Sequence, residues 1–311
     1  MISAITGQQY QIVAGAYRAT VTELGAGLRE LLFRDQPLVA GYVADELPPG
    51  GAGQLLAPWP NRIDGGRYVF GGTAFQLALT EPDHTNAIHG LTRWMAWTPL
   101  RHGASAVVLR SAPHGQQGYP FCLEITVEYS LHPDSGLRVA ITASNRGSRA
   151  APYGTGSHPY LTAGMPLVDD CALTLPAAFW LRTDDRGIPS GRPEAVEGTP
   201  YDFRHSRAIG STKLDHALTG LARDHDSRTW AYLAAIDGQG SRIGLWADEG
   251  YRWLQVFTGD PLEPERRRKA VAIEPMTCPP NAFATGDDLL IIEPGEAVTH
   301  TWGIQAFNGA G

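Results

Sequence analysis

A carboxylate closes a short apolar run near the C-terminus. The stretch KAVAIEPMTCPPNAF (269–283) places Glu274 directly before Pro275. Ala, Val and Ile are typical of a buried strand, and proline cannot donate to a strand ladder, so we expect Glu274 at the end of a strand. A buried carboxylate is costly unless it is paired, hydrogen-bonded or faces a cleft. Glu274 is therefore a candidate acid–base group, with a solvated strand-end acid as the alternative.

Two stiff, aromatic loops in the first third of the chain carry a second set of polar groups. In APWPNRIDGGRYVF (57–70), two prolines and a tryptophan lead to Asn61 and Arg62. An arginine in such a rigid loop is a candidate donor lining a cleft, and a surface charge is the ordinary alternative. In HTNAIHGLTRWMAW (84–97), His89 precedes a glycine. The five-residue spacing of its two histidines differs from the zinc helix motif HExxH, so a metal site has little support.

Two further loops place reactive residue types among apolar neighbours. APYGTGSHPYLTAG (151–164) contains His158 directly after Ser157. This arrangement is not G-x-S-x-G and has no strand-to-helix elbow, which argues against a serine hydrolase. STKLDHALTG (211–220) places Asp215 in a similar setting. A structural or surface role is the alternative for each of these residues.

The elements that would position these residues are strands. Apolar and polar residues alternate with a period of two over much of the chain, and no long window has helical periodicity. HPDSG (132–136) has the composition of a hairpin turn. We therefore predict an all-β fold, a single large antiparallel β-sandwich domain over residues 1–311. The expected strands are 17–24, 67–72, 105–111, 121–131, 136–145, 228–237, 253–259 and two strands within 289–307.

The composition narrows the classes of function. The chain has 25 Lys and Arg against 32 Asp and Glu, a formal net charge of −7. This balance argues against nucleic acid or an anionic membrane as the main partner. The three cysteines are scattered and lack CxxC spacing, as expected for reduced thiols in a cytoplasmic protein. The first residues lack the features of a signal peptide, and no run is long enough to span a bilayer.

Five motifs occur in an order and with separations that resemble the aldose 1-epimerases, or galactose mutarotase-like proteins. The resemblance covers most of the chain, from GAGLREL (25–31) to EPGEAVTHTWGI (293–304). It implies a large β-sandwich, often called a supersandwich, with a sugar site in a cleft on one sheet. It also implies chemistry that needs no cofactor and no metal. The motifs are NRI, NAIHG, SHPYL, LDHALTG and AIEPMTCPPNAF.

The resemblance implies a role for each matched residue. His158 corresponds to the histidine that protonates the ring oxygen of the sugar. Glu274 corresponds to the carboxylate that takes the proton of the anomeric hydroxyl. His89 and Arg62 correspond to residues that bind and polarise the sugar, and Asp215 to an acid that holds sugar hydroxyls. The substrate-binding residues predicted on this basis are Arg62, His89, Asp215 and Asn61.

These roles agree with the chemistry of mutarotation, which opens a hemiacetal and closes it on the other face of the aldehyde. One group must remove the O1 proton while another gives a proton to O5. A carboxylate and an imidazolium on either side of C1 suit these tasks. We therefore predict an isomerase, a mutarotase that interconverts the α and β anomers of a free aldohexose, as a monomer or a homodimer.

Three alternatives remain open. Ser157 and Pro159 beside His158, and Pro275 after Glu274, depart from the residues usual in galactose-type members of this family. This difference indicates a divergent bacterial branch. The substrate of such a branch could be an anionic hexose, phosphorylated or sulfonated, near the basic run ERRRK (265–269), which otherwise is a solvated loop. A non-catalytic sugar-binding or regulatory protein on the same fold is a second alternative. A glycoside hydrolase using Glu274 and Asp215 is the third, and it requires two carboxyl groups at a defined separation.

Overall fold

The regular structure of this chain is almost entirely β-strand. The computed structural model describes residues 4–236 and 242–307. The ladders within its two largest sheets are antiparallel, which confirms the predicted all-β, antiparallel fold class. Each predicted strand is present, except that residue 237 of the predicted strand 228–237 lies outside the described residues.

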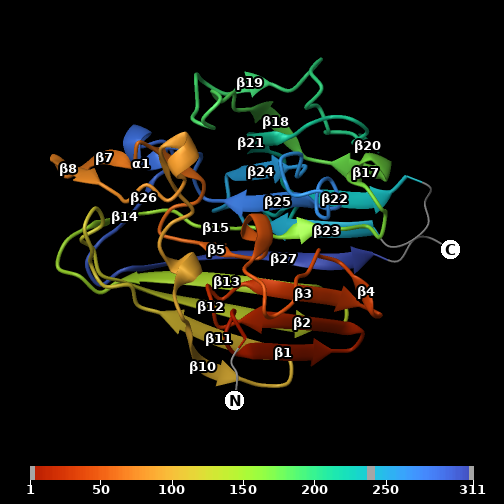
Figure 1. The fold of residues 1–311 in the computed structure, drawn as a ribbon, viewed down its shortest axis with the longest axis horizontal. Coiled ribbons are helices and arrows are strands. Elements are labelled where there is room, and N and C mark those ends of the chain that lie inside the picture. The colour runs from red at the N-terminus through yellow and green to blue at the C-terminus, as the bar shows by residue number, and fades with distance from the viewer. Residues whose placement is uncertain (1–3, 237–241, 308–311) are drawn as a thin grey trace.

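The largest sheet has nine strands and spans the molecule in Figure 1. Its hairpin between His132 and Gly136 confirms the turn predicted from HPDSG. The C-terminal strand lies at the centre of the sheet, between the first four strands and the last four. In spatial order the strands are β10 (Thr98–His102), β11 (Ala106–Ser111), β12 (Leu123–His132), β13 (Gly136–Asn145), β27 (Ala297–Phe307), β23 (Arg242–Ala247), β22 (Thr229–Ala235), β17 (Cys171–Thr174) and β20 (Arg207–Ala208).

A second sheet of eight strands carries Glu274 and Asp215, and His158 lies between two of its strands. Two of its strands, β15 and β16, both pair with β25 and are separated by a break of two residues. In spatial order the strands are β19 (Glu194–Ala195), β18 (Ala177–Trp180), β21 (Asp215–Leu221), β24 (Trp253–Phe257), β25 (Val271–Met276), β15 (Gly156–Ser157) with β16 (Tyr160–Leu161), and β5 (Leu55–Leu56).

Smaller elements complete the fold. Strands β1 and β2 of an N-terminal sheet pack on β11 and β12 (Figure 1). That sheet contains β1 (Gln9–Ala14), β2 (Tyr17–Thr22), β3 (Leu28–Phe33) and β4 (Gln36–Pro37). The two-stranded pairs are β6 (Arg62–Asp64) with β9 (Asn86–Ile88), β7 (Arg67–Phe70) with β8 (Thr73–Gln76), and β14 (Ala151–Tyr153) with β26 (Leu290–Ile292). The helices are α1 (Ala282–Thr285) and the 3₁₀ turns η1 (Pro49–Gly51), η2 (Pro82–His84), η3 (Thr92–Trp94) and η4 (Val168–Asp170).

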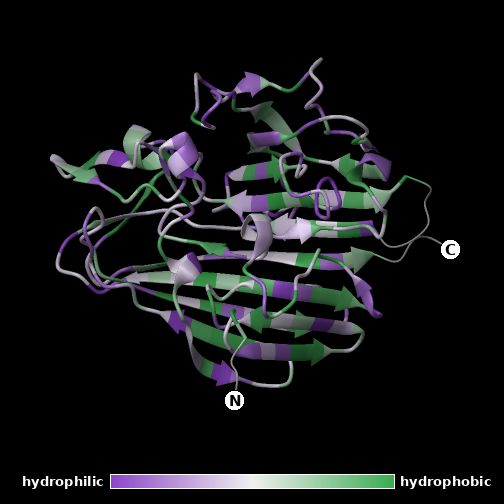
Figure 2. Cartoon of the chain, viewed as in Figure 1, coloured by the Kyte–Doolittle hydropathy of each residue, from purple (hydrophilic) through white to green (hydrophobic). Residues whose placement is uncertain are grey.

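One hydrophobic core joins the three larger sheets. Burial alternates along β12, as the period-two pattern predicts, and Figure 2 shows hydrophobic residues gathered in the strands. The core contains Ile12 of the N-terminal sheet, Val127 of the nine-stranded sheet and Ile273 of the eight-stranded sheet, all fully buried. Glu274 follows Ile273 directly, so this core fixes the backbone of the candidate acid. Within the two described ranges, no helix is long and apolar enough to cross a membrane.

Candidate active site

A polar cavity of about 460 Å³ lies over the eight-stranded sheet. Strands β21, β24 and β25 contribute its floor, and the loops that lead into η1, η2 and η3 contribute its walls. A volume of this size is within the range of small-ligand sites. All the residues that the sequence analysis selected for function line this one cavity: Asn61, Arg62, His89, His158, Asp215 and Glu274.

Glu274 lies inside strand β25 rather than at its end, so the expectation that Pro275 stops the ladder was wrong. The amide of Ile273 donates to the carbonyl of Pro159 (3.2 Å), and the nitrogen of Pro275, two residues on, faces the same edge of the strand. The neighbouring strand is interrupted along this edge, between β15 and β16. The strand tolerates proline because the missing N–H falls at the interruption.

His158 occupies that interruption and points toward Glu274. Its Nε2 lies 3.3 Å from Oε1 of Glu274. The amide of His158 donates to the carbonyl of Gln54 (3.0 Å), and the amide of Gly53 donates to the carbonyl of His158 (2.8 Å). The ring of Tyr160 stacks on the imidazole, with centroids 5.0 Å apart. The backbone and one face of His158 are thus fixed before any substrate arrives.

The pair of Glu274 and His158 is almost completely buried. Burial lowers the pKa of His158 to about 3. Burial, followed by the negative charge of Asp215, raises the pKa of Glu274 well above its usual range. Both shifts favour the uncharged forms, a protonated carboxyl beside a neutral imidazole. The imidazolium expected from the sequence is not the resting form, because both charged forms are penalised in this desolvated position.

His89 and Asn61 form a compact unit at the cavity wall. The amide of Asn61 donates to Nδ1 of His89 (3.2 Å), and the amide of His89 donates to the carbonyl of Asn61 (2.9 Å). Burial lowers the pKa of His89 well below its usual range, and the nearby His158 lowers it further. Because Nδ1 accepts a hydrogen bond, the neutral ring carries its proton on Nε2. His89 is therefore a neutral donor.

Asp215 lies at the start of β21 and receives a hydrogen bond from the floor of the cavity. Nε2 of Gln255 donates to its Oδ1 (2.6 Å). The side chain is open to the cavity, yet the protein atoms around it raise the pKa of Asp215, and the charge of Arg62 opposes this shift. Two carboxyl groups, Asp215 and Glu274, thus line one cavity with the guanidinium groups of Arg62 and Arg93.

Arg62 reaches the cavity from β6 and is held by an acid that the sequence analysis did not select. Its Nε and Nη2 donate to the two carboxylate oxygens of Glu81, each at 2.8 Å. Sequence reasoning also missed Arg93 and Gln255, which line the cavity as well. Arg93 lies in the same loop as His89, within HTNAIHGLTRWMAW (84–97), but no spacing rule connects Glu81 or Gln255 to the motifs.

The basic run at 265–269 does not line the cavity. Arg266 binds the carboxylate of Glu46 through Nη2, at 2.9 Å from both oxygens. Arg268 pairs with Asp169 (2.8 Å) and with Asp260 (3.0 Å). These arginines therefore stabilise loops of the fold, and the proposal that the run approaches an anionic substituent finds no support in these contacts.

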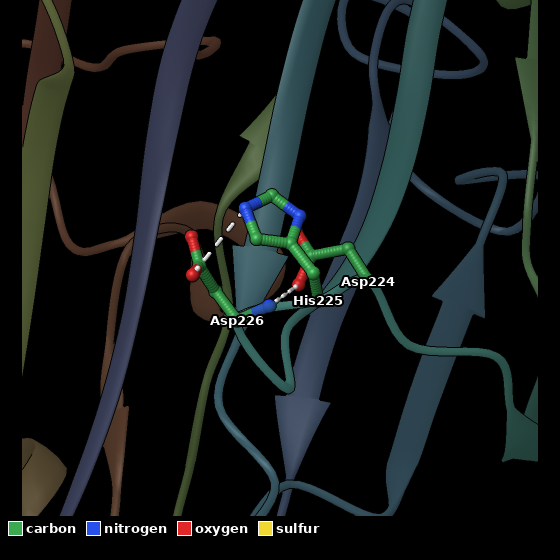
Figure 3. Close-up of side chains that lie close together, drawn as sticks. All are labelled: Asp224, His225 and Asp226. Carbon is green, nitrogen blue, oxygen red and sulfur yellow. Dashed lines mark hydrogen bonds and ion pairs between the residues drawn. The ribbon is translucent and has the colours of Figure 1, made fainter.

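A cluster of metal-ligand residue types lies outside the cavity lining, in the turn between β21 and β22 (Figure 3). It consists of Asp224, His225 and Asp226. Asp224 Oδ1 accepts hydrogen bonds from the amides of Asp226 and Arg228, and its Oδ2 accepts one from the indole of Trp230. Asp224 is thus used to shape the turn, and His225 is an exposed side chain beside Asp226.

Comparison with known proteins agrees with this geometry. A family model described as aldose 1-epimerase matches residues 8–305. The chain is 38% identical to an uncharacterized protein of Escherichia coli, YihR, over 94% of this chain and 91% of that protein. It is 26% identical to the galactose mutarotase of Sus scrofa, over 95% of this chain and 93% of the mutarotase.

Solved structures show the same fold. The GalM/aldose epimerase homologue from C. elegans superposes with a TM-score of 0.85 at 20% sequence identity, covering 97% of this chain and 99% of that chain. At that identity the superposition supports the fold alone. The match of the family model over nearly the whole chain and the 38% identity to a relative of similar length carry the assignment. The chain therefore belongs to the aldose 1-epimerase family of isomerases.

Proposed function

We propose that the protein is a mutarotase, which interconverts the α and β anomers of a free aldohexose through the proton shared by Glu274 and His158. The observation that carries this proposal is their 3.3 Å contact at the floor of a sugar-sized polar cavity. A carboxyl group and an imidazole so close together form an acid–base couple with one exchangeable proton. A protein that only bound a sugar would have little use for such a couple.

The reaction uses the pair in its charge-separated form. The resting proton of Glu274 crosses to Nε2 of His158, which gives a carboxylate and an imidazolium. Glu274 then removes the O1 proton while His158 donates its proton to O5, so that the C1–O5 bond breaks and an aldehyde forms at C1. Rotation about C1–C2 presents the other face. The reverse proton transfers close the ring as the opposite anomer and return both groups to their starting state.

The other cavity residues make the charge-separated form accessible. The charge of Arg62 lowers the pKa of Glu274 and so opposes the effect of burial. His89, as a neutral donor, offers an N–H to a sugar oxygen without adding a further positive charge to those of Arg62 and Arg93. Asp215, Gln255 and Asn61 supply further groups for sugar hydroxyls. Fixed dipoles and charges that are placed before the reaction lower its barrier without further reorganisation.

The test is polarimetry on freshly dissolved α-D-glucose and α-D-galactose, with wild-type protein and with the variants E274Q and H158N. We expect the wild type to speed the approach to the same final anomer ratio. Each variant should lose roughly 10²–10⁴-fold in rate, the range for one acid–base group. Retained activity in either folded variant would exclude the assigned pair, and sugar binding without any acceleration by the wild type would favour the non-catalytic alternative.

Arg93 favours a second candidate, a mutarotase for an anionic hexose. This arginine lines the cavity, and no acid forms an ion pair with it within the described ranges. Burial lowers its pKa, and its guanidinium lies 5.1 Å from the ring centroid of Trp94. An arginine without a carboxylate partner at a ligand site is suited to a phosphate or sulfonate group, because such groups match its planar donors.

Anomer exchange measured by NMR on D-glucose and on D-glucose 6-phosphate separates the two candidates. An anionic substrate predicts a higher kcat/KM for the phosphate ester, and R93Q should remove that preference while leaving the rate on D-glucose nearly unchanged. A neutral substrate predicts the opposite ranking, with R93Q equal to wild type on the phosphate ester.

A further inference from the structure

The contact between Arg62 and Glu81 is a bidentate, largely buried ion pair rather than a single contact at the surface. Two nitrogens of the guanidinium face the two oxygens of the carboxylate, each at 2.8 Å. The side chains are only 15% and 20% exposed. Bidentate pairs of this kind fix orientation as well as charge. Glu81 therefore determines which way the arginine of the cavity wall points.

Glu81 is itself held from behind. Nδ2 of Asn86 donates to its Oε2 (3.0 Å) and also to the carbonyl of Arg186 (2.9 Å). Nη2 of Arg186 donates to Oδ1 of Asp64 (2.6 Å), and its Nε donates to the carbonyl of His84 (2.9 Å). The turn that contains Arg186 is therefore attached to both strands of the β6–β9 pair.

The turn that contains Arg186 also packs against Arg62 through Gly187. Gly187 has φ of +75°, and a Cβ placed there would lie 2.5 Å from Nη1 and 2.9 Å from Cζ of Arg62. The backbone of Gly187 therefore packs against the guanidinium group. Glu81 binds Nε and Nη2 of Arg62, and Gly187 packs against Nη1. The guanidinium group therefore has few other rotamers available.

We propose that Glu81 is a positioning residue for the anomerisation, which acts through Arg62. It holds the guanidinium at the cavity wall in the orientation that the sugar meets, and it offsets part of the arginine's charge. Without it, Arg62 would be drawn toward the two carboxyl groups of the cavity, Asp215 and Glu274. The inference rests on the proposed function, because it assigns Glu81 a part in that reaction.

The charge of Glu81 bears on the acid–base couple. Arg62 lowers the pKa of both Glu274 and Asp215, whereas Glu81 raises that of Asp215. The charged and titratable groups near Glu81 are Arg62 of β6, His84 of η2 at 3.4 Å, Arg93 of η3 and Asp215 of β21, and Asn86 of β9 donates a hydrogen bond to it. Removing the negative charge leaves the positive charge of Arg62 less compensated, so the pKa of Glu274 falls. Glu274 holds the one proton of the resting pair, so the alkaline limb of the pH–rate profile, where that proton is lost, should then move to lower pH.

The experiment compares E81Q with E194Q, a matched control. Glu194 makes the same bidentate contact with Arg182 (3.1 Å for both bonds), but that pair is about half exposed and does not line the cavity. E81Q should lose about tenfold in kcat/KM, the scale of a modest misplacement of a binding group, with the alkaline limb shifted to lower pH. E194Q should match the wild type in both. Equal behaviour of the two variants would overturn the inference.

Two further variants separate positioning from general destabilisation. E81D keeps the charge but shortens the side chain, so kcat/KM should fall with no shift of the alkaline limb. R62A should lose activity, and E81Q should add nothing to it if Glu81 acts only through Arg62. An additional loss in the double variant would contradict the inference.

The wild-type chain distinguishes this inference from the proposal on which it rests. If the wild type speeds anomer exchange and E81Q does so equally well, only the role of Glu81 is refuted. If the wild type neither speeds exchange nor binds D-glucose, D-galactose or D-glucose 6-phosphate by calorimetry, both the function and the role of Glu81 are refuted.

Discussion

The substitution Gly51→Ala tests whether the position of His158 limits the rate. Gly51 ends the 3₁₀ turn η1 and lines the cavity. Its φ is +80°, and a Cβ there would lie 3.2 Å from Cδ2 and 3.5 Å from Nε2 of His158. The nitrogen that faces Glu274 is thus within reach of a single added methyl group.

Two separate costs follow from this geometry. A left-handed backbone conformation with a Cβ costs roughly 1–2 kcal/mol of folding stability. The contact at 3.2 Å also requires the imidazole to move by a few tenths of an ångström. A misplacement of 1 Å can cost about 10²-fold in rate, so a shift of this size should cost roughly tenfold in kcat.

Gly164→Ala provides the control, because Gly164 has φ of +79° and, among the described residues, only its chain neighbours lie within 4 Å of its Cβ position. Urea unfolding should show a similar loss of stability for both variants, whereas NMR anomer exchange should show the tenfold loss in kcat for Gly51→Ala alone. A full rate for Gly51→Ala, or an equal loss in both variants, would refute the claim that the placement of His158 controls the reaction.

Two more predictions concern stability. Because the pKa of His158 is lowered to about 3, the folded chain binds fewer protons than the unfolded chain at acidic pH. The free energy of unfolding therefore has its full value above about pH 6.5 and decreases as the pH falls toward 3. H158Q should make urea unfolding less sensitive to pH across that window, and an unchanged sensitivity would count against burial of a neutral imidazole. Arg268→Ala breaks two ion pairs and should cost about 3 kcal/mol by urea unfolding, with the anomerisation rate per folded molecule unchanged. A selective loss of rate would restore the basic run as part of the site.

The strands were predictable because they depend on a local pattern. The alternation along 136–145 gave β13 with the same bounds, and the residues around Pro294 separated β26 from β27. Strands β1, β3, β21 and β23 were not among the expected strands. The short strands β5, β6, β15 and β16 were also missed, because two or three residues carry no period. Their pairing depends on neighbours that lie far away in the sequence.

The sequence predicted six residues that line the cavity, but not their protonation or the local strand geometry. The resemblance selected six residues, and all of them line one cavity. The position of Pro275 inside β25 depends on an interruption in the neighbouring strand, which sequence alone does not reveal. The neutral resting form of Glu274 and His158 depends on burial from all sides. Glu81 was missed because its proposed positioning role depends on its contact with Arg62, which lies 19 residues earlier in the chain.

Exchange NMR on equilibrated α and β anomers tests the central claim most directly, since it measures interconversion without any change in composition. With D-glucose, D-galactose and D-glucose 6-phosphate in turn, the account predicts exchange between the two C1 protons in the presence of the wild type for at least one sugar. It also predicts exchange at the rate of buffer alone with E274Q. Exchange at the buffer rate with the wild type for all three sugars, or undiminished exchange with folded E274Q, would contradict the account.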